Sequence, residues 1–356
     1  MPNRLRWGIL STARIARTLF VPGVRAASES EVLAVGSRSL ELARAFAEEL
    51  EIPRAYGSYD ALLGDSEVDA IYIGLPNSLH TEWTIRAANA GKHVLCEKPL
   101  ARTAADAERM LAACRAAGVL LMEAFMWRHH PQHARVRALL ESGAVGAPSF
   151  VRASFGYVIN PRAEPLLVRP AHTGARADAA PRGGRLNTSS GSAGLNVRLD
   201  PLLEGGSLMD VGCYGVNAAR WLFGSEPVGF AAQQHVDPRY GVEVSFGGVL
   251  RFADRQLAMV DSSFAHVGLN RYEIAGPEGR IVVDRAFRPD DAPGRIELYQ
   301  GSEQRVESVP PANQFANEAD HFARSIRAGT LLPPAEDGVA QARALESLYS
   351  AARAGS

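Results

Sequence analysis

Cysteines are few and widely spaced in this chain of 356 residues. Cys96, Cys114 and Cys213 form no Cys-x-x-Cys pair, which argues against a disulfide framework and a cysteine-based zinc site and fits a reducing compartment. No apolar run approaches the roughly 20 residues that a membrane-spanning helix needs, and the segment from Met1 to Arg4 lacks the features of a secretory signal. The sequence therefore predicts a cytoplasmic protein without a membrane partner.

An excess of charge of either sign is also lacking. The 38 basic and 39 acidic residues leave a formal net charge of -1, so the charge gives no reason to expect nucleic acid or an anionic membrane as partner. Hydrophobic residues make up 46% of the chain and charged residues 22%, which is typical of a globular protein with substantial cores. The length is comfortable for two domains.

Lysine is nearly absent, because only Lys92 and Lys98 stand among the 38 basic residues and the rest are arginines. The two cations differ chemically, since surroundings can tune the pKa of a lysine whereas arginine stays protonated in a protein. Chance explains two neighbouring lysines equally well when composition alone is considered. Whether either lysine has a catalytic or binding role must therefore be judged from the residues around it.

Residues 1–125 alternate short apolar runs with amphipathic stretches. Expected strands cover 5–10, 31–36, 70–74, 93–96 and 119–122; expected helices cover 15–27, 39–50, 103–117 and the stretch that ends at position 90. This alternation is typical of a parallel sheet wrapped by helices. We therefore expect an α/β protein whose first domain, residues 1–125, is a doubly wound Rossmann domain.

Residues 126–356 have a different pattern. Expected strands cover 150–157, 242–252, 257–264, 271–275, 280–284 and 295–299; expected helices cover 210–223, 313–328 and 336–354. This order predicts an α+β domain with a large, mainly antiparallel open sheet, whose C-terminal helices are free to pack back on the first domain. Residues 164–194 have few large apolar side chains, which predicts a mobile insertion, with a binding lid as the alternative.

The turn after the first expected strand is a candidate dinucleotide site, because backbone N–H groups and the helix dipole there receive a pyrophosphate. A Gly-x-Gly-x-x-Gly fingerprint would fall at positions 11, 13 and 16, where this chain has Ser11, Ala13 and Ala16. Small residues still permit close approach of a phosphate, and a tight turn before a packed helix is the alternative. The cofactor-binding residues predicted here are Ser11, Thr12, Ala13, Arg14 and Ile15.

The end of the second expected strand indicates which dinucleotide is bound. An acidic residue at this point would bind the ribose 2′-hydroxyl of NAD, but the chain reads Gly36-Ser37-Arg38-Ser39. Ser37 can donate to a 2′-phosphate, and Arg38 can pair with the phosphate while stacking on the adenine. We therefore predict NADP as cofactor, with NAD possible and with a solvated Arg38 as the alternative.

Several motifs occur in a fixed order along the chain: residues 7–16, Glu97-Lys98-Pro99, Met126-Trp127-Arg128 and residues 205–214. Together they resemble the glucose–fructose oxidoreductase, inositol dehydrogenase and rhizopine catabolism (Gfo/Idh/MocA) family. Within that family the chain is most similar to the NADP-dependent D-xylose dehydrogenases and the dimeric dihydrodiol dehydrogenases. The resemblance spans nearly the whole chain except residues 164–194.

The resemblance implies a set of site residues. Lys98 is implied to lie beside the nicotinamide and the reacting carbinol. Asp210 and Tyr214, which belong to the second domain, are implied to face it. Further cofactor contacts implied are Leu75, Pro76, Asn77, His80, Glu97 and Arg128; implied substrate contacts are Trp127, Asn196 and Arg198. The alternatives are a structural role for His80, a packing role for the Trp127–Arg128 pair, and ordinary helix-start roles for Asp210 and Tyr214. A homodimer through the open sheet is also implied.

The residue types fit hydride transfer from a secondary alcohol, which needs a base and a cation near the developing alkoxide. Tyr214, with a free pKa of about 10, needs a lowered pKa to act as the base, and Lys98 is expected to lower it. Asp210 lies four positions earlier and is expected on the same helix face. The predicted function is oxidation of an aldose at C1 or reduction of a keto-sugar. The alternatives are a trans-dihydrodiol dehydrogenase and a non-catalytic sugar sensor that binds a dinucleotide.

A metal site is not expected. His129, His130 and His133 are close in sequence, and positions 129 and 133 would share a helix face. No nearby carboxylate or thiol completes a ligand set, and Pro131 is expected to interrupt the helix between them.

Overall fold

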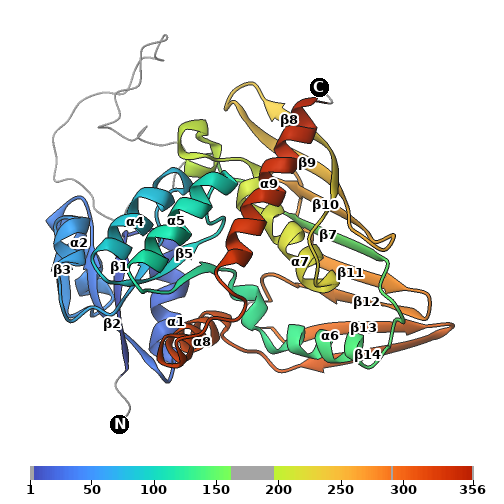
Figure 1. Cartoon of the computed structure of the whole chain (residues 1–356), viewed down its shortest axis with the longest axis horizontal. Coiled ribbons are helices and arrows are strands. Elements are labelled where there is room, and N and C mark those ends of the chain that lie inside the picture. Colours follow the sequence, from blue (N-terminus) through green and yellow to red (C-terminus); the bar gives the residue numbers. More distant parts are fainter. Residues whose placement is uncertain (1–3, 162–195, 290–291, 355–356) are drawn as a thin grey trace.

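The computed structural model describes residues 4–161, 196–289 and 292–354. Two sheets lie side by side, one flanked by helices on both faces and the other broad and twisted (Figure 1). The insertion predicted at residues 164–194 lies outside the described residues. The predicted fold, a Rossmann sheet followed by a large, mainly antiparallel sheet, is confirmed.

The first sheet is entirely parallel. Its strands are β1 (Leu5–Leu10), β2 (Ser30–Gly36), β3 (Arg54–Tyr56), β4 (Ala70–Ile73), β5 (His93–Glu97) and β6 (Leu121–Ala124), in the order β3-β2-β1-β4-β5-β6. The strand order reverses between β1 and β4, and ligands of such sheets bind in the crevice at that point. The sequence analysis did not predict β3, because the three half-buried residues of this strand form no apolar run.

Helices cover both faces of this sheet. They are η1 (Ala16–Phe20), α1 (Val21–Ala26), α2 (Leu40–Glu49), α3 (Tyr59–Leu63), η2 (Asn77–Leu79), α4 (His80–Asn89) and α5 (Ala104–Ala116). Ser39 caps α2, since its hydroxyl accepts from the Leu42 N–H. Alternate residues of β4 enter different cores: Tyr72 packs with α1, and Ile71 packs with the α3–α5 side. This alternation explains why β4 is apolar throughout.

The second sheet has eight strands: β7 (Phe150–Gly156), β8 (Gly229–Asp237), β9 (Val242–Arg251), β10 (Leu257–Ser263), β11 (Asn270–Gly276), β12 (Gly279–Asp284), β13 (Gly294–Gln300) and β14 (Glu303–Val309). The order is β14-β13-β12-β11-β7-β10-β9-β8, and β7 with β10 is the one parallel pair among the described strands of this second sheet. The sequence analysis missed β8 and β14. Both are edge strands with mostly exposed or half-buried residues, so they carry no apolar alternation.

The remaining helices are η3 (Met126–His129), α6 (Pro131–Glu141), η4 (Val197–Leu199), η5 (Pro201–Leu203), η6 (Leu208–Gly212), α7 (Cys213–Phe223), α8 (Gln314–Ala328) and α9 (Glu336–Ala354). Figure 1 shows α6, α7 and α9 on one side of the second sheet. The last two helices contact the first unit: the Asp320 carboxylate of α8 accepts the Glu29 N–H at 2.8 Å, and Glu346 of α9 accepts the Ala104 N–H at 3.0 Å.

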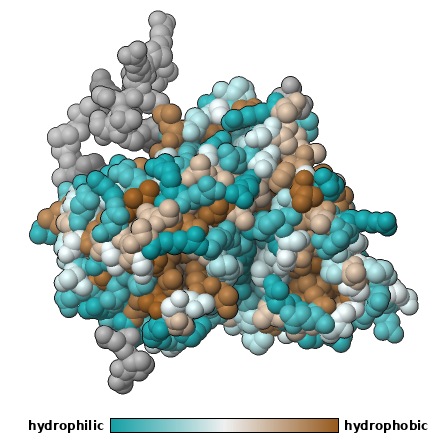
Figure 2. All heavy atoms as spheres, viewed as in Figure 1, coloured by the Kyte–Doolittle hydropathy of each residue, from teal (hydrophilic) through white to brown (hydrophobic). Residues whose placement is uncertain are grey.

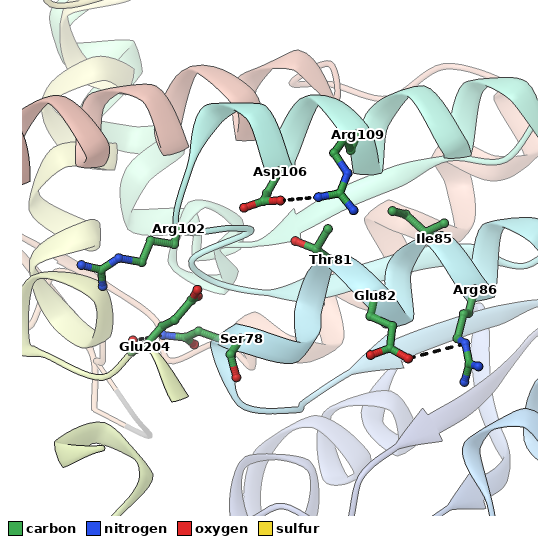
Figure 3. Close-up of a pocket in the computed structure, with 10 residues that line it drawn as sticks. Ser78, Thr81, Glu82, Ile85, Arg86, Arg102, Asp106, Arg109 and Glu204 are labelled. Atoms are coloured by element: carbon green, nitrogen blue, oxygen red, sulfur yellow. Dashed lines mark hydrogen bonds and ion pairs between the residues drawn. The ribbon is translucent and has the colours of Figure 1, made fainter. Parts of the chain in front are cut away.

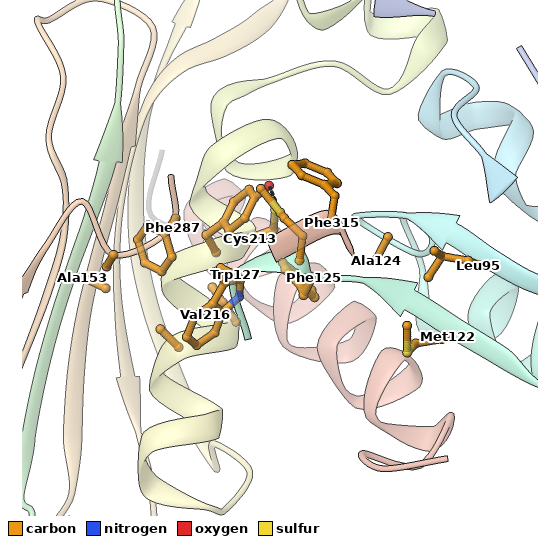
Figure 4. Close-up of a cluster of buried hydrophobic side chains, with 14 of the residues drawn as sticks. Leu95, Met122, Ala124, Phe125, Trp127, Ala153, Cys213, Val216, Phe287 and Phe315 are labelled. Atoms are coloured by element: carbon orange, nitrogen blue, oxygen red, sulfur yellow. Dashed lines mark hydrogen bonds between the residues drawn. The ribbon is translucent and has the colours of Figure 1, made fainter. Parts of the chain in front are cut away.

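One hydrophobic core runs between the two sheets. Figure 4 shows Trp127 between Leu95 and Met122 of the first sheet on one side and Ala153 and Phe287 on the other. The Trp127 ring is fully buried and meets the Phe287 ring edge-on at 5.6 Å. Truncating such an aromatic side chain costs about 3–5 kcal/mol. This shared core therefore holds the two sheets, and the residues between them, in a fixed relative position.

Hydrophilic residues cover most of the face seen in Figure 2, with apolar residues in smaller areas between them. Among the helices of the described residues, none has both the length and the apolar character needed to cross a bilayer.

Candidate active site

The turn after β1 is held by a serine in an unusual backbone conformation. Ser11 has a φ of 131°, in the region that normally favours glycine. Its hydroxyl accepts the Ala13 N–H at 2.8 Å, and the Arg17 N–H donates to the Ala13 carbonyl at 3.1 Å as the helix begins. Ser11 thus takes the backbone conformation expected of the first fingerprint glycine and stabilises it with its own side chain.

The end of β2 places a hydroxyl next to a guanidinium. Ser37 is buried and its N–H donates to the Tyr56 carbonyl at 3.0 Å, whereas Arg38 is exposed. No carboxylate stands at positions 36–39. These donors fit a phosphate better than a ribose hydroxyl, which needs an acceptor at this point.

Lys98 lies at the carboxyl end of β5, where the structure brings it together with Asp210 and Tyr214. Its Nζ donates to the main-chain carbonyl of Asp210 at 2.6 Å and lies 3.5 Å from Asp210 Oδ1. The same atom lies 5.0 Å from the centroid of the Tyr214 ring. An ammonium has three N–H donors, and within the described residues no further acceptor takes the third one.

The Asp210 carboxylate accepts from two other side chains as well. Arg198 Nε lies 2.9 Å from Oδ1, and the Tyr157 hydroxyl donates to Oδ2 at 2.7 Å. Burial raises the pKa of Asp210, but the Arg198 and Lys98 charges and these hydrogen bonds prevail and lower that pKa to about 2. Asp210 is therefore a fixed carboxylate. The predicted substrate residue Arg198 belongs to this group.

Tyr157 is a site residue that the sequence analysis missed. It directly follows β7, and the sequence pattern placed it at the end of a strand with no feature that marks it for chemistry. Its N–H donates to the Ser263 carbonyl at 2.9 Å, and its ring lies 5.5 Å from the Phe264 ring. Only the fold shows that its hydroxyl meets Asp210.

The net pKa of Tyr214 is raised and not lowered as expected, although the Lys98 charge acts in the expected direction. Tyr214 is buried, its hydroxyl contacts Met126 Sδ at 3.4 Å, and Lys98 lies over the face of the ring. Burial raises the pKa of Tyr214 by more than the Lys98 charge lowers it. The expected single helix is also divided, because Asp210 lies in the π-turn η6 and Tyr214 in the first turn of α7.

Two glycines allow the loop before η6 to turn tightly. A Cβ on Gly205 would lie 2.4 Å from the Arg198 carbonyl oxygen, and one on Gly206, whose φ is 120°, would lie 2.3 Å from Glu243 Oε1. The same Glu243 oxygen accepts the Leu208 N–H at 3.0 Å at the start of η6. The Gly205-Gly206 motif therefore sets where Arg198 and Asp210 meet.

Glu97 and His80 are buried supports of the strand-end loops. Glu97 accepts the Tyr72 hydroxyl at 2.7 Å and the Lys98 N–H at 3.2 Å. The His80 ring nitrogens lie 3.0 Å from the Pro99 carbonyl and 2.9 Å from the Leu75 carbonyl. Burial raises the pKa of Glu97 and lowers the pKa of His80. The structure thus favours the structural alternative for His80, and Glu97 fixes the backbone at Lys98.

Trp127 and Arg128 have partners within the protein, which fits the packing alternative, and their ligand contacts stay predictions. The Trp127 ring is fully buried, and its Nε1 donates to Asn217 Oδ1 at 3.1 Å. Arg128 donates to the same oxygen at 2.8 Å and to Asp337 at 2.6 Å. Asn196 is likewise used locally, because its Nδ2 donates to the carbonyl of residue 160 at 3.1 Å.

The clustered histidines have other partners. Pro131 does not interrupt a helix but begins α6, with His130 as its N-cap, and His129 lies in the preceding 3-10 turn. His133 contacts the Tyr272 hydroxyl and the carbonyl of residue 286, each at 2.9 Å. Across residues 4–161, 196–289 and 292–354, no three His, Cys, Asp or Glu side chains gather in a metal-binding group.

A polar cavity of about 440 Å³ lies beside the site, between α4, α5 and the loop at Glu204 (Figure 3). Figure 3 shows ion pairs of Asp106 with Arg109 and of Glu82 with Arg86 along its wall. Asn77 joins it to the strand end, since its Nδ2 donates to the Glu204 carbonyl at 2.9 Å. The catalytic candidates do not line this cavity.

Comparisons with known proteins agree with this arrangement. Residues 5–125 match the GFO_IDH_MocA oxidoreductase family, NAD-binding Rossmann fold, and residues 133–282 match the GFO/IDH/MocA C-terminal domain. The chain is 36% identical to D-xylose 1-dehydrogenase (NADP(+)) 2 of Haloferax volcanii, over 99% of this chain and 98% of the relative. It is 30% identical to trans-1,2-dihydrobenzene-1,2-diol dehydrogenase of Xenopus tropicalis, over 91% and 90%.

A solved structure extends the likeness to three dimensions. The aldose-aldose oxidoreductase of Caulobacter crescentus, complexed with glycerol, superimposes with a TM-score of 0.83 at 32% identity, over 99% of each chain. The dTDP-3,4-didehydro-2,6-dideoxy-alpha-D-glucose 3-reductase of Saccharopolyspora spinosa is a further relative, 34% identical over the full length of both chains.

Proposed function

The chain belongs to the GFO/IDH/MocA oxidoreductase family, and from this premise we propose that it is an NADP-dependent oxidoreductase that transfers hydride between a sugar and the nicotinamide. The substrate carbon is C1 of an aldose or the carbonyl carbon of a keto-sugar. The observation that carries the proposal is the Lys98 ammonium at the end of β5, held by Asp210 and left with an N–H to donate.

The chain's own residues fit NADP. The Ser11 turn offers backbone N–H groups beside the start of a helix, where a pyrophosphate is received. Ser37 and Arg38 offer donors for a 2′-phosphate, with no acid to repel it. The name of the Haloferax volcanii relative specifies the same cofactor. When bound, NADP supplies the nicotinamide that gives or accepts the hydride.

Lys98 binds the substrate oxygen in this proposal. Charge develops on that oxygen as hydride is transferred, and a fixed cation beside it stabilises the transition state. The Asp210 carbonyl and carboxylate hold the ammonium in place before substrate arrives. Proximity to Asp210 and Tyr214 raises the pKa of Lys98 against the effect of burial, so the group stays charged during turnover.

In the reductive direction Tyr214 donates the proton as a neutral phenol. Its raised pKa suits donation to a developing alkoxide, which is a far stronger base than phenolate. Its present partner, Met126 Sδ, is a weak acceptor, so a substrate oxygen can replace it at little cost. In the oxidative direction Tyr214 acts as the phenolate: its oxygen takes the proton of the substrate hydroxyl and becomes the neutral phenol, and the Lys98 charge offsets the charge of the phenolate.

The test is a spectrophotometric panel with the purified chain. NADP and NAD are each offered with pentoses, hexoses and a trans-dihydrodiol, and NADPH with keto-sugars. We expect turnover with at least one sugar and a preference for NADP. Turnover restricted to the dihydrodiol would favour the alternative that the Xenopus relative represents. Tight binding of NADP without turnover on any substrate would favour a non-catalytic sensor.

We also propose that the chain forms a homodimer through the second sheet. All of α6, α7 and α9 lie on one side of that sheet (Figure 1), and the opposite side exposes Arg152 and Met259 on neighbouring strands. A second copy is the occupant that family likeness suggests. Light scattering that gives the mass of one chain at micromolar concentration would overturn this assignment.

A further inference from the structure

We propose that Tyr157 is a positioning residue of the active site: its hydroxyl fixes the Asp210 carboxylate and thereby keeps Lys98 Nζ available to the substrate oxygen. This inference rests on the proposed function. It assigns a role to a residue that neither the sequence motifs nor the family match marks.

The Asp210 carboxylate is shared among donors from separate parts of the fold. Tyr157, after β7, donates to Oδ2 at 2.7 Å, and Arg198, in η4, lies 2.9 Å from Oδ1. Lys98, after β5, lies 3.5 Å from Oδ1 and is therefore the most distant of these side-chain partners. The shorter contacts of Tyr157 and Arg198 satisfy the carboxylate, so it does not need to draw the ammonium closer.

Loss of the Tyr157 hydroxyl would leave the Asp210 carboxylate with one donor fewer. Asp210 is largely buried, with 13% of its side chain exposed, and a charged oxygen left without a donor there is destabilised, because it has lost its solvation by water. The carboxylate would turn to recover a donor, and the Lys98 ammonium, now 3.5 Å from Oδ1, is a charged donor that can move closer, because lysine has a flexible stem and its charge strengthens the bond. A tight Lys98–Asp210 pair would then use the N–H that the substrate oxygen needs.

The Tyr157 ring would stay in place without its hydroxyl. The Tyr157 N–H is bonded to the Ser263 carbonyl at 2.9 Å, and the ring packs against Phe264. Phenylalanine keeps both contacts. The Tyr157→Phe variant therefore removes one hydrogen bond and leaves the packing.

The chain contains a matched control. Tyr56 is also half-buried, and its hydroxyl donates to Asp65 Oδ2 at 2.8 Å, in a carboxylate that also accepts from Arg54 at 2.8 Å. This group lies in the first unit, at the edge strand β3. Tyr56→Phe removes the same kind of bond at a place where no substrate is expected.

The experiment compares Tyr157→Phe and Tyr56→Phe with the wild type, on the best substrate of the panel. We expect Tyr157→Phe to lower kcat about tenfold or more, since one misplaced donor has effects of this order, with the dissociation constant of NADP within twofold. Tyr56→Phe should leave kcat within twofold. An unchanged kcat in Tyr157→Phe, or a loss explained by weaker NADP binding, would overturn the proposal.

A second measurement does not depend on turnover. The chain has two lysines, so ¹⁵Nζ labelling of lysine gives one ammonium signal for each in an NMR spectrum of the protein without cofactor. Tyr157→Phe should shift the Lys98 signal and leave that of Lys92 in place, and Tyr56→Phe should do the reverse. A Lys98 signal that does not respond would contradict the inference even if the wild type is active. An inactive wild type would instead overturn the proposed function.

Discussion

Both lysines of the chain donate to the main-chain carbonyl of an aspartate whose carboxylate also holds a tyrosine and an arginine. The edge cluster, in the first unit, consists of Lys92, Asp65, Tyr56 and Arg54; the site cluster consists of Lys98, Asp210, Tyr157 and Arg198. The lysine-to-carbonyl distances are 2.7 Å and 2.6 Å. The same four residue types thus make similar contacts in both clusters, and only the site cluster lies at the expected reaction centre.

The clusters differ in how many acceptors the ammonium has. Lys92 donates to a second carbonyl, that of Val68, at 2.8 Å, and no carboxylate of the described residues lies within ion-pair distance of it. Burial lowers the pKa of Lys92, whereas the charges around Lys98 raise the pKa of Lys98. Lys92 is therefore used by the backbone, and Lys98 retains an N–H for a ligand.

The largest expected difference between the clusters is in turnover. Lys98→Arg keeps a positive charge but replaces a compact, rotatable donor by a planar one. We expect kcat to fall about 10²- to 10⁴-fold, with NADP binding measured by fluorescence titration largely retained. Lys92→Arg should keep normal turnover. Near-normal turnover in Lys98→Arg, or an equal loss in both variants, would contradict a catalytic role that Lys98 has and Lys92 lacks.

The next largest difference is expected between variants of the two aspartates, Asp210 and Asp65. Asp210→Asn removes the charge that holds Lys98, and we expect kcat to fall about tenfold to hundredfold, because positioning and electrostatics are both weakened. Asp65→Asn should leave kcat unchanged and lower stability by about 1–3 kcal/mol. Steady-state kinetics and urea unfolding separate these outcomes.

The pKa of Asp210 also predicts the acid side of the wild-type rate profile. Its pKa of about 2 lies below the ordinary value near 3.9, so the active carboxylate form persists as the pH falls to about 4. Its contribution to folding has the same sign: it is full above about pH 4 and is lost as the pH falls towards 2. A limb in kcat near pH 5 that vanishes in Asp210→Asn would contradict this assignment.

The comparison also shows where sequence reasoning succeeds. The Rossmann sheet was predictable because β1, β4 and β5 are apolar runs of the right length. Lys98 was predictable because it stands in a motif at a strand end. The edge strands β8 and β14 were not, since exposed strands leave no periodic apolar signal.

The site cluster could be predicted only in part, for a physical reason. Its members come from four segments that span 112 positions from Lys98 to Asp210, and their meeting depends on the fold of both units. Tyr157 has no local feature that marks it. The net pKa of Tyr214 was predicted in the wrong direction, because burial prevails over the Lys98 charge. The sequence shows that a lysine is available but not how deeply the tyrosine is buried.

Lys92 provides a prediction about stability alone. Lys92→Met keeps the apolar stem but leaves the carbonyls of Asp65 and Val68 without their donor. We expect a loss of about 1–3 kcal/mol in the free energy of unfolding, the cost of unsatisfied buried groups. Urea denaturation measures it, and kcat per folded molecule should equal that of the wild type. A stability equal to the wild type would mean that water replaces the ammonium.

The smallest effect is expected for Tyr56→Phe, which removes one hydrogen bond from the edge cluster. The loss should be about 0.5–1.5 kcal/mol at pH 7, because Asp65 keeps its contacts with Arg54. These contacts lower the pKa of Asp65 against the effect of burial, so its carboxylate stabilises the fold above about pH 4 and ceases to do so as the pH falls. The difference between variant and wild type should therefore shrink in acid, as followed by urea unfolding at pH 7 and pH 3.5. A difference that grows in acid would show that the hydroxyl acts on a partner other than the carboxylate, and the two clusters would no longer be comparable.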